Sequence, residues 1–321
     1  VLRQQLADMA GHEARSVCVV PMPHEFRPVT MNTSMDVDYL SPEFFQRVKI
    51  AVDEAARRGM NYWIYDEGGW PSGLAAGRVV AARPDVAVRV LRCHADGTWT
   101  PDIVAKWAPG EIGVADLLNP ESTQTFISLT HERYAAAVGS HFGKAIKMTF
   151  TDEPKYQAAV PGSAVPWPLG AEDVFRRWFG YDAMEALDAF RVTKMQDLTT
   201  AQKKARVDLF DFWSRRFRDA YFLELRDWAR QHGLASGGHL DNEDDTFAPV
   251  SRGFGSVMRP LRAMDVPGVD VIWRQIWPGK ENHHFPKFAS SAAHQNGTAL
   301  ALTESFGVYG NGLTPAQMKW L

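Results

Sequence analysis

The sequence predicts an α/β fold in which parallel strands curl into a TIM-type (β/α)8 barrel, and three observations support this fold class. Six short runs of β-branched or aromatic residues alternate with amphipathic helices, which is the element order of a parallel sheet. Most runs end in polar or glycine-rich loops, as expected where a barrel collects its site at the carboxyl ends of the strands. No GxGxxG or P-loop motif follows a strand, which disfavours a doubly wound nucleotide-binding fold.

Each expected element is a local pattern bounded by a cap or a turn. The strands are expected at 16–21, 61–65, 145–150, 234–240, 269–273 and 298–302. The helices are expected at 1–10, 41–59, 125–142, 172–179, 199–232 and 285–295. The helix over 199–232 has the clearest pattern, because large apolar residues from Phe210 to Trp228 recur at intervals of three and four.

The two ends of the chain carry half helices. Residues 1–10 lack an N-cap, and a helix that begins at Thr314 is cut at Leu321. Six strands do not close an eight-stranded barrel, so we expect an incomplete barrel without its first and last strands. Residues 1–321 are interpreted as one catalytic barrel domain fragment, with a small β-insertion near 84–118 and an irregular insertion near 155–198.

The composition of the chain disfavours several classes of protein and of binding partner. Lys+Arg 35 against Asp+Glu 38 gives a net charge of −3, which does not suggest binding to nucleic acid. No apolar run approaches the ~18–20 residues of a membrane span. The two cysteines exclude a disulfide scaffold. Aromatic residues make up 12% of the chain, and several tryptophans stand beside acids and glycines, a combination that suits sugar rings.

Two glutamates at strand ends are the candidate catalytic pair. Glu153 follows one predicted strand and Glu304 follows another, far apart in sequence. In a barrel both would face one pocket, where one acid can protonate a glycosidic oxygen while the other activates water or attacks the anomeric carbon. Strand-end acids also cap helices or pair with basic side chains, and that simpler role stays open for each of them.

Seven further residues near strand ends are expected to bind sugar hydroxyls or to form the walls of the pocket. The glycines after Asp66 and Glu67 allow close approach of the backbone to a ligand. His239 and Asp241 alternate along their strand and therefore face the same way. The predicted set is Asp66, Glu67, Trp70, His239, Asp241, Trp273 and Arg274.

Four runs of sequence resemble glycoside hydrolase family 106, the α-L-rhamnosidase family. They are YDEGGWPSG at 65–73, TDEP at 151–154, GGHLD at 237–241 and TESFG at 303–307. The resemblance implies a (β/α)8 domain of a secreted or periplasmic bacterial enzyme that inverts configuration and carries accessory β-domains in the same chain. It matches Glu153 to the general acid and Glu304 to the general base, and it implies a calcium ion near the sugar.

The sequence therefore predicts an inverting glycosidase whose substrate is an α-L-rhamnoside or a related glycoside. Two alternatives remain. A carbohydrate-binding pseudoenzyme would be expected to lack one catalytic acid, whereas both candidates are present. A metal-dependent hydrolase barrel would be expected to carry a His-x-His pair at an early strand end, and the sequence contains none.

Overall fold

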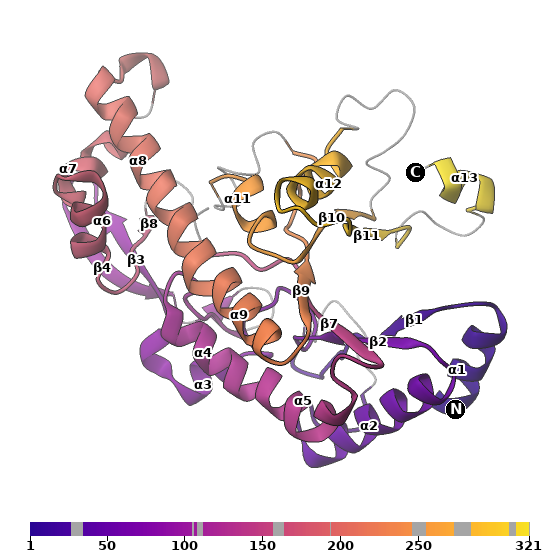
Figure 1. The fold of residues 1–321 in the computed structure, drawn as a ribbon. Coiled ribbons are helices and arrows are strands. Elements are labelled where there is room, and N and C mark those ends of the chain that lie inside the picture. The colour runs from indigo at the N-terminus through magenta and orange to yellow at the C-terminus, as the bar shows by residue number, and fades with distance from the viewer. Residues whose placement is uncertain are drawn as a thin grey trace.

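A curled six-stranded parallel sheet is the centre of the computed structural model (Figure 1). The structure describes residues 1–26, 35–104, 106–107, 112–156, 164–192, 194–245, 255–272, 284–307 and 313–320. The strand order is β1-β2-β7-β9-β10-β11, and every neighbouring pair is parallel. These strands are β1 (Ser16–Cys18), β2 (Asn61–Tyr65), β7 (Ile146–Thr151), β9 (Ala235–Gly238), β10 (Val266–Val271) and β11 (Leu302–Ser305). The predicted α/β class is confirmed: this half-barrel is consistent with an incomplete TIM-type barrel.

Helices connect successive strands of the sheet, and side-chain caps explain where several of them begin. Ser41 Oγ accepts the N–H of Phe44 at 3.1 Å, and Asn119 accepts the N–H of Glu121 at 3.1 Å. Among the helices are α1 (Leu2–Gly11), α2 (Pro42–Arg57), α3 (Arg78–Ala82), α4 (Pro120–Leu129), α5 (His131–Val138), α11 (Met258–Leu261), α12 (Pro286–Gln295) and α13 (Pro315–Trp320). In the described part of the chain, no helix is both long enough and apolar enough to cross a membrane.

The predicted long helix is one rod with a π-helical turn in the middle. It comprises α8 (Thr200–Phe217), the π-turn η5 (Arg218–Phe222) and α9 (Leu223–Gln231). Thr199 starts it with a complete capping box. Its buried face packs aromatic rings into the main core. In Figure 1 the rod runs diagonally from the region of α6 and α7 toward β9.

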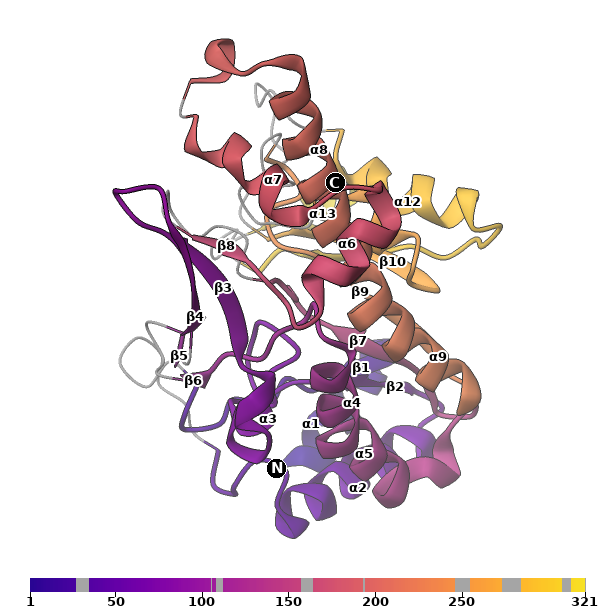
Figure 2. The same cartoon turned by 90° about the vertical axis from the view of Figure 1, so that its left-hand side faces the viewer.

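A second, antiparallel sheet lies on the opposite side of this rod from β1 and β11 in Figure 1, and Figure 2 shows its strands from another side. Its order is β4-β3-β8, with β3 (Val88–Cys93), β4 (Trp99–Val104) and β8 (Ala164–Pro166). The indole Nε1 of Trp213 donates to Pro166 O at 3.0 Å and ties this sheet to α8. The remaining short elements are β5 (Lys106–Trp107), β6 (Ile112–Gly113), α6 (Ala171–Phe179), α7 (Ala183–Leu187), η1 (Pro84–Val86), η2 (Gly139–His141), η3 (Asp188–Arg191) and η4 (Met195–Asp197).

Several element ends differ from the prediction by a few residues, as in β1 and β10, and two differences bear on the site or on the helices. The strand expected at 298–302 lies at Leu302–Ser305, because Thr298 is still part of the preceding helix end and its N–H donates to Ala293 O at 2.9 Å. The helix expected at 125–142 is divided into α4 and α5 at Thr130, whose hydroxyl donates to Phe126 O at 2.8 Å. The first shift matters for function, since it places Glu304 inside β11.

Close contact between β7 and β9 requires glycine at the carboxyl end of β9. Gly238 pairs with Thr151 and has φ of +149°, and a Cβ at this position would lie 2.1 Å from Thr151 O. Neither strand can move away without losing its place in the sheet. The glycines that the sequence places before His239 therefore let the strand ends of β7 and β9 meet, which brings Asp152 and His239 together.

Candidate active site

The candidate site lies at the carboxyl ends of the parallel strands, where several residues turn the chain in a left-handed conformation. Glu153 (φ 46°), Asn242 (φ 59°) and Phe306 (φ 72°) follow β7, β9 and β11 respectively. Non-glycine residues rarely adopt positive φ, and such strained positions cluster at functional sites. Glu153 is thus both a candidate catalytic acid and a strained turn residue at this rim.

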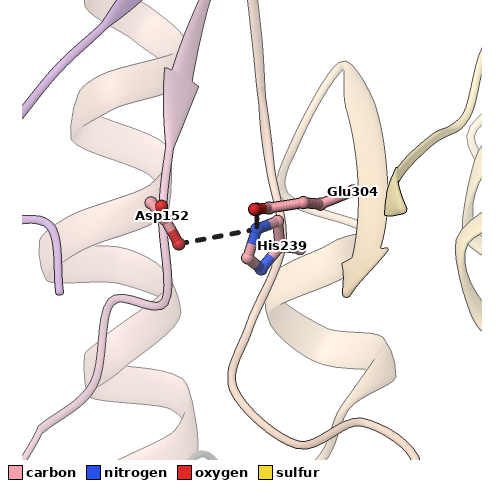
Figure 3. Close-up of side chains that lie close together, drawn as sticks. All are labelled: Asp152, His239 and Glu304. Atoms are coloured by element: carbon pink, nitrogen blue, oxygen red, sulfur yellow. Dashed lines mark hydrogen bonds and ion pairs between the residues drawn. The ribbon is translucent and has the colours of Figure 1, made fainter. Parts of the chain in front are cut away.

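His239 joins two carboxylates that belong to different strands (Figure 3). Its Nε2 lies 2.7 Å from Glu304 Oε2 and 3.5 Å from Asp152 Oδ1. Its Nδ1 lies 2.8 Å from the carbonyl oxygen of Leu240. Carboxylate and carbonyl oxygens both accept, so both ring nitrogens carry protons and His239 is an imidazolium.

The charges of this cluster hold its members in defined protonation states. Burial pulls the pKa of His239 down, but the hydrogen bond with Glu304 and the charges of Asp152 and Glu243 outweigh burial and raise the pKa well above its usual range. The same hydrogen bond lowers the pKa of Glu304. His239 is only 1% exposed, whereas the Glu304 side chain is 40% exposed. Glu304 therefore presents an ionised carboxylate to solvent, and the buried His239 stabilises that carboxylate by a hydrogen bond from the protein interior.

Glu153 has the opposite electrostatic environment. Burial, followed by repulsion from Asp241, raises the pKa of Glu153 to about 7. Lys155 Nζ lies 4.0 Å from Glu153 Oε2 and 3.0 Å from Asp241 Oδ2, so Asp241 is the closer partner of the lysine. Glu153 is thus largely protonated just below neutral pH, while its side chain keeps 16% exposure.

Asp152 connects the cluster to the loop after β2. The Tyr65 hydroxyl lies within hydrogen-bond reach of both Asp152 Oδ2 and Gly69 O. The N–H of Asp152 donates to Ser72 Oγ at 2.8 Å, and the N–H of Ser72 donates back to Asp152 O at 2.7 Å. These bonds fix the position of the Asp152 carboxylate, and burial raises its pKa.

The carboxylate of Glu67 is fully used by the backbone of its own loop. It accepts four N–H groups, from Gly68, Leu74, Ala75 and Ala76, at 2.6 to 2.8 Å. Four bonds occupy the acceptor positions of a carboxylate, and Glu67 is 1% exposed. We infer that Glu67 shapes this loop, in contrast to the sugar-binding role that the sequence predicts.

Asp66 and Trp70 are also placed by this loop. Asp66 is 1% exposed, its Oδ1 accepts the Ser72 hydroxyl at 2.6 Å, and burial raises its pKa well above the usual range. Trp70 is half-buried and packs on Phe26 with ring centroids 4.7 Å apart. Asp66 is therefore enclosed beneath the rim, whereas Trp70 keeps part of its surface. Trp273 and Arg274, the other predicted wall residues, lie outside the described residues.

Three residues matter here that the sequence did not single out. Asp152 contacts His239, Lys155 pairs with Asp241, and Glu243 Oε1 accepts the N–H of Leu240 at 2.6 Å. Asp152 could have been suspected from its position directly after a predicted strand. The contacts of Lys155 and Glu243 depend on loop geometry, for which the sequence offers no periodic signal.

The Asp152–His239–Glu304 group is also the one set in the described ranges whose potential metal-ligand atoms lie within 4.8 Å of one another. One imidazole nitrogen and two carboxylates do not match the six to eight oxygens that calcium takes. The calcium ion implied by the family resemblance thus has no fitting site in this group, and the expectation of calcium stays a prediction.

Comparison with solved structures shows that the fold is similar to the folds of two glycoside hydrolases. No protein-family model and no curated protein matches the sequence. The structure of a rhamnosidase from Novosphingobium sp. PP1Y is similar over 95% of this chain and 53% of its own, with 12% identity and a TM-score of 0.57. The glycoside hydrolase domain of PgaB (BpsB) from Bordetella bronchiseptica is similar over 94% of this chain and 77% of its own, with 14% identity and a TM-score of 0.53.

The shared property is the fold. At these identities the likeness extends to the curled parallel sheet of a TIM-type barrel, and the chain spans about half the length of the rhamnosidase. Membership of glycoside hydrolase family 106 stays a prediction.

Proposed function

We propose that this chain carries the catalytic half-barrel of an O-glycosidase in which Glu153 is the general acid and Glu304 the general base. One observation carries the proposal: two accessible carboxyl groups at the same rim of the sheet have pKa values displaced in opposite directions, that of Glu153 to about 7 and that of Glu304 downward. Acid and base catalysis on one glycosidic bond requires two carboxyl groups whose pKa values differ in this way, so that one is protonated while the other is ionised.

In this proposal each proton transfer belongs to one group. Glu153 donates its proton to the glycosidic oxygen as the bond between that oxygen and the anomeric carbon breaks. Glu304 accepts a proton from a water molecule whose oxygen forms the new bond to the anomeric carbon. Inversion follows if water attacks from the face opposite the leaving group, and it needs roughly 6.5–9.5 Å between the two carboxyl groups.

An α-L-rhamnoside is the first substrate that we propose. The sequence resemblance and the similarity to the Novosphingobium rhamnosidase fold both support this choice. A screen of aryl glycosides with the full chain, followed by NMR of the anomeric proton of the first-formed sugar, tests the sugar and the stereochemistry separately.

The decisive experiment compares Glu153→Gln with Glu304→Gln on two leaving groups. Glu153→Gln should lose about 10²–10⁴-fold on a disaccharide, whose leaving oxygen needs the proton, and much less on an activated aryl glycoside. Glu304→Gln should lose a similar factor on both substrates, because water must be activated in either case. Glu121→Gln, which alters an exposed ion pair with Arg83, is the matched control.

Two results would contradict these roles. Equal loss on both leaving groups for Glu153→Gln, together with a lowered melting temperature, would mean that this residue only holds its loop. If added azide gave a glycosyl azide of retained configuration with Glu153→Gln, Glu304 would be a nucleophile and the enzyme would be retaining.

A metal-dependent hydrolase is the second candidate, and the spacing of Asp152, His239 and Glu304 is the observation that favours it. Metal analysis of the purified full chain separates the two candidates. Stoichiometric zinc or manganese that is lost in His239→Gln, with loss of activity on chelation and recovery on re-addition, would favour the metal. Absence of these metals from an active preparation would favour the imidazolium–carboxylate pair.

A further inference from the structure

Four arginines line one cavity among the outer helices, at a distance in the fold from the rim site. The cavity has a volume of about 490 Å³ and lies between α9, the η5 turn, α11 and the end of α12. Its arginines are Arg218, Arg226, Arg259 and Arg262. None of the rim residues contributes to its wall, so it is separate from the candidate active site.

The charge of this cavity is not balanced by its neighbours. Arg218 and Arg226 each pair with the aspartate that follows them, at 2.6 and 2.9 Å. Arg259 shares Asp211 with Arg215, both at 2.7 Å. Arg262 forms no ion pair with another described residue. The four lining guanidinium groups thus have three carboxylate partners, one of which is shared with Arg215 outside the cavity, and no carboxylate is among the described lining residues.

Two of the four lining arginines are held close to the protein surface. The side chains of Arg226 and Arg259 are only 23% and 26% exposed, whereas that of Arg218 is 38% exposed and Arg262 is exposed. Arg218 begins the π-helical turn, and such turns are frequent at functional sites. Ser256 and Gln295 add neutral hydrogen-bond donors to the same wall. Fixed, partly desolvated guanidinium groups are the usual partners of phosphate and sulfate groups, which they bind through paired N–H donors.

We propose that this cavity binds a small molecule that carries a phosphate or sulfate group. The excess of guanidinium groups over carboxylates in this wall favours an anion. The volume falls in the range of small-molecule sites and leaves space for an organic portion beside the anion. Arginines near helix ends can also serve only to pair with backbone carbonyls and surface aspartates, and the experiment below separates that role from ligand binding.

The test measures binding of inorganic phosphate to the full chain by calorimetry and by thermal melting. Phosphate should raise the melting temperature more than sodium chloride of equal ionic strength. The double variant Arg226→Gln/Arg262→Gln should weaken phosphate binding at least tenfold, while Arg47→Gln, an exposed arginine 3.4 Å from Asp36, should not change it. Inorganic sulfate tests whether either dianion is accepted, and glucose 6-phosphate compared with glucose tests the space for an organic portion.

Melts without ligand show whether the double variant is folded. Equal effects of phosphate and chloride on the parent chain, or phosphate affinity that persists in a folded double variant, would overturn the proposal. If the double variant does not fold, the phosphate affinity of the single variant Arg262→Gln is measured instead. This variant is expected to fold, because Arg262 forms no ion pair with a described residue.

Discussion

Replacing His239 by glutamine should move the acidic limb of the pH–rate profile to higher pH. Glutamine can keep an N–H near Glu304 but removes the positive charge. A hydrogen bond to a charged group contributes about 1.5–3 kcal/mol against about 0.5–1.5 kcal/mol for a neutral one. Loss of the positive charge therefore raises the pKa of Glu304, and the rise is small because the side chain is 40% exposed and solvent screens the interaction.

The sign follows from the role of Glu304. The base must be ionised, so activity is lost as the pH falls through its pKa, and His239 lowers that pKa. Without the imidazolium, the pKa of Glu304 rises and the loss occurs at higher pH, while the basic limb, set by Glu153 near pH 7, moves less.

The assay is kcat/KM on an aryl glycoside from pH 4 to 9. His232→Gln is the control, because His232 stacks on Trp228 at the end of α9 and does not contact the rim cluster. An acidic limb that stays in place or moves to lower pH in a folded His239→Gln variant would refute the proposed support of Glu304 by His239.

Three further predictions concern stability and are read by thermal and denaturant unfolding. Glu67→Gln should lower the free energy of unfolding by about 2–4 kcal/mol, because an amide nitrogen would face backbone N–H groups that now bind a carboxylate; an unchanged melt would refute this role. Gly238→Ala should cost about 3 kcal/mol or more, since its Cβ would meet Thr151 O and its φ of +149° is strained for an L residue, whereas Gly297→Ala, at a φ of +70° with free space, should cost only about 1 kcal/mol. Equal costs would argue against the close contact of β7 and β9. Burial, followed by the charge of His232, lowers the pKa of His131 from 6.5 to about 3, so the unfolded chain takes up a proton first and stability falls as the pH drops through this interval; His131→Gln should reduce that acid sensitivity.

The sequence allowed the sheet to be predicted because its signals are local. Apolar runs, caps and strand-end loops located all six strands, with ends that differ by a few residues. The exception is β11, where the apolar run at 298–302 was taken for the strand. Its first residues complete the helix end before it, and the paired strand continues through Glu304. Pairing with β10, which decides the register, cannot be seen in the run itself.

For the candidate site, the sequence predicts positions at strand ends better than it predicts contacts. Glu153 follows β7 and Glu304 lies near the end of β11, but their protonation states depend on contacts with residues distant in sequence. The sequence indicated a histidine and an acidic loop as sugar ligands. Burial makes His239 a support for Glu304 and gives Glu67 four backbone donors, and neither outcome follows from periodicity.

The hydrogen bond between His239 and Glu304 also sets an order of events during synthesis of the chain. Its partners are 65 positions apart, and the contact between Tyr65 and Asp152 spans 87. At roughly 5–20 residues per second, a ribosome needs about 3–13 seconds to extend the chain from the histidine to the glutamate. Until then His239 cannot form its hydrogen bond with Glu304, and β11, which carries Glu304, is the last of the six strands to be made.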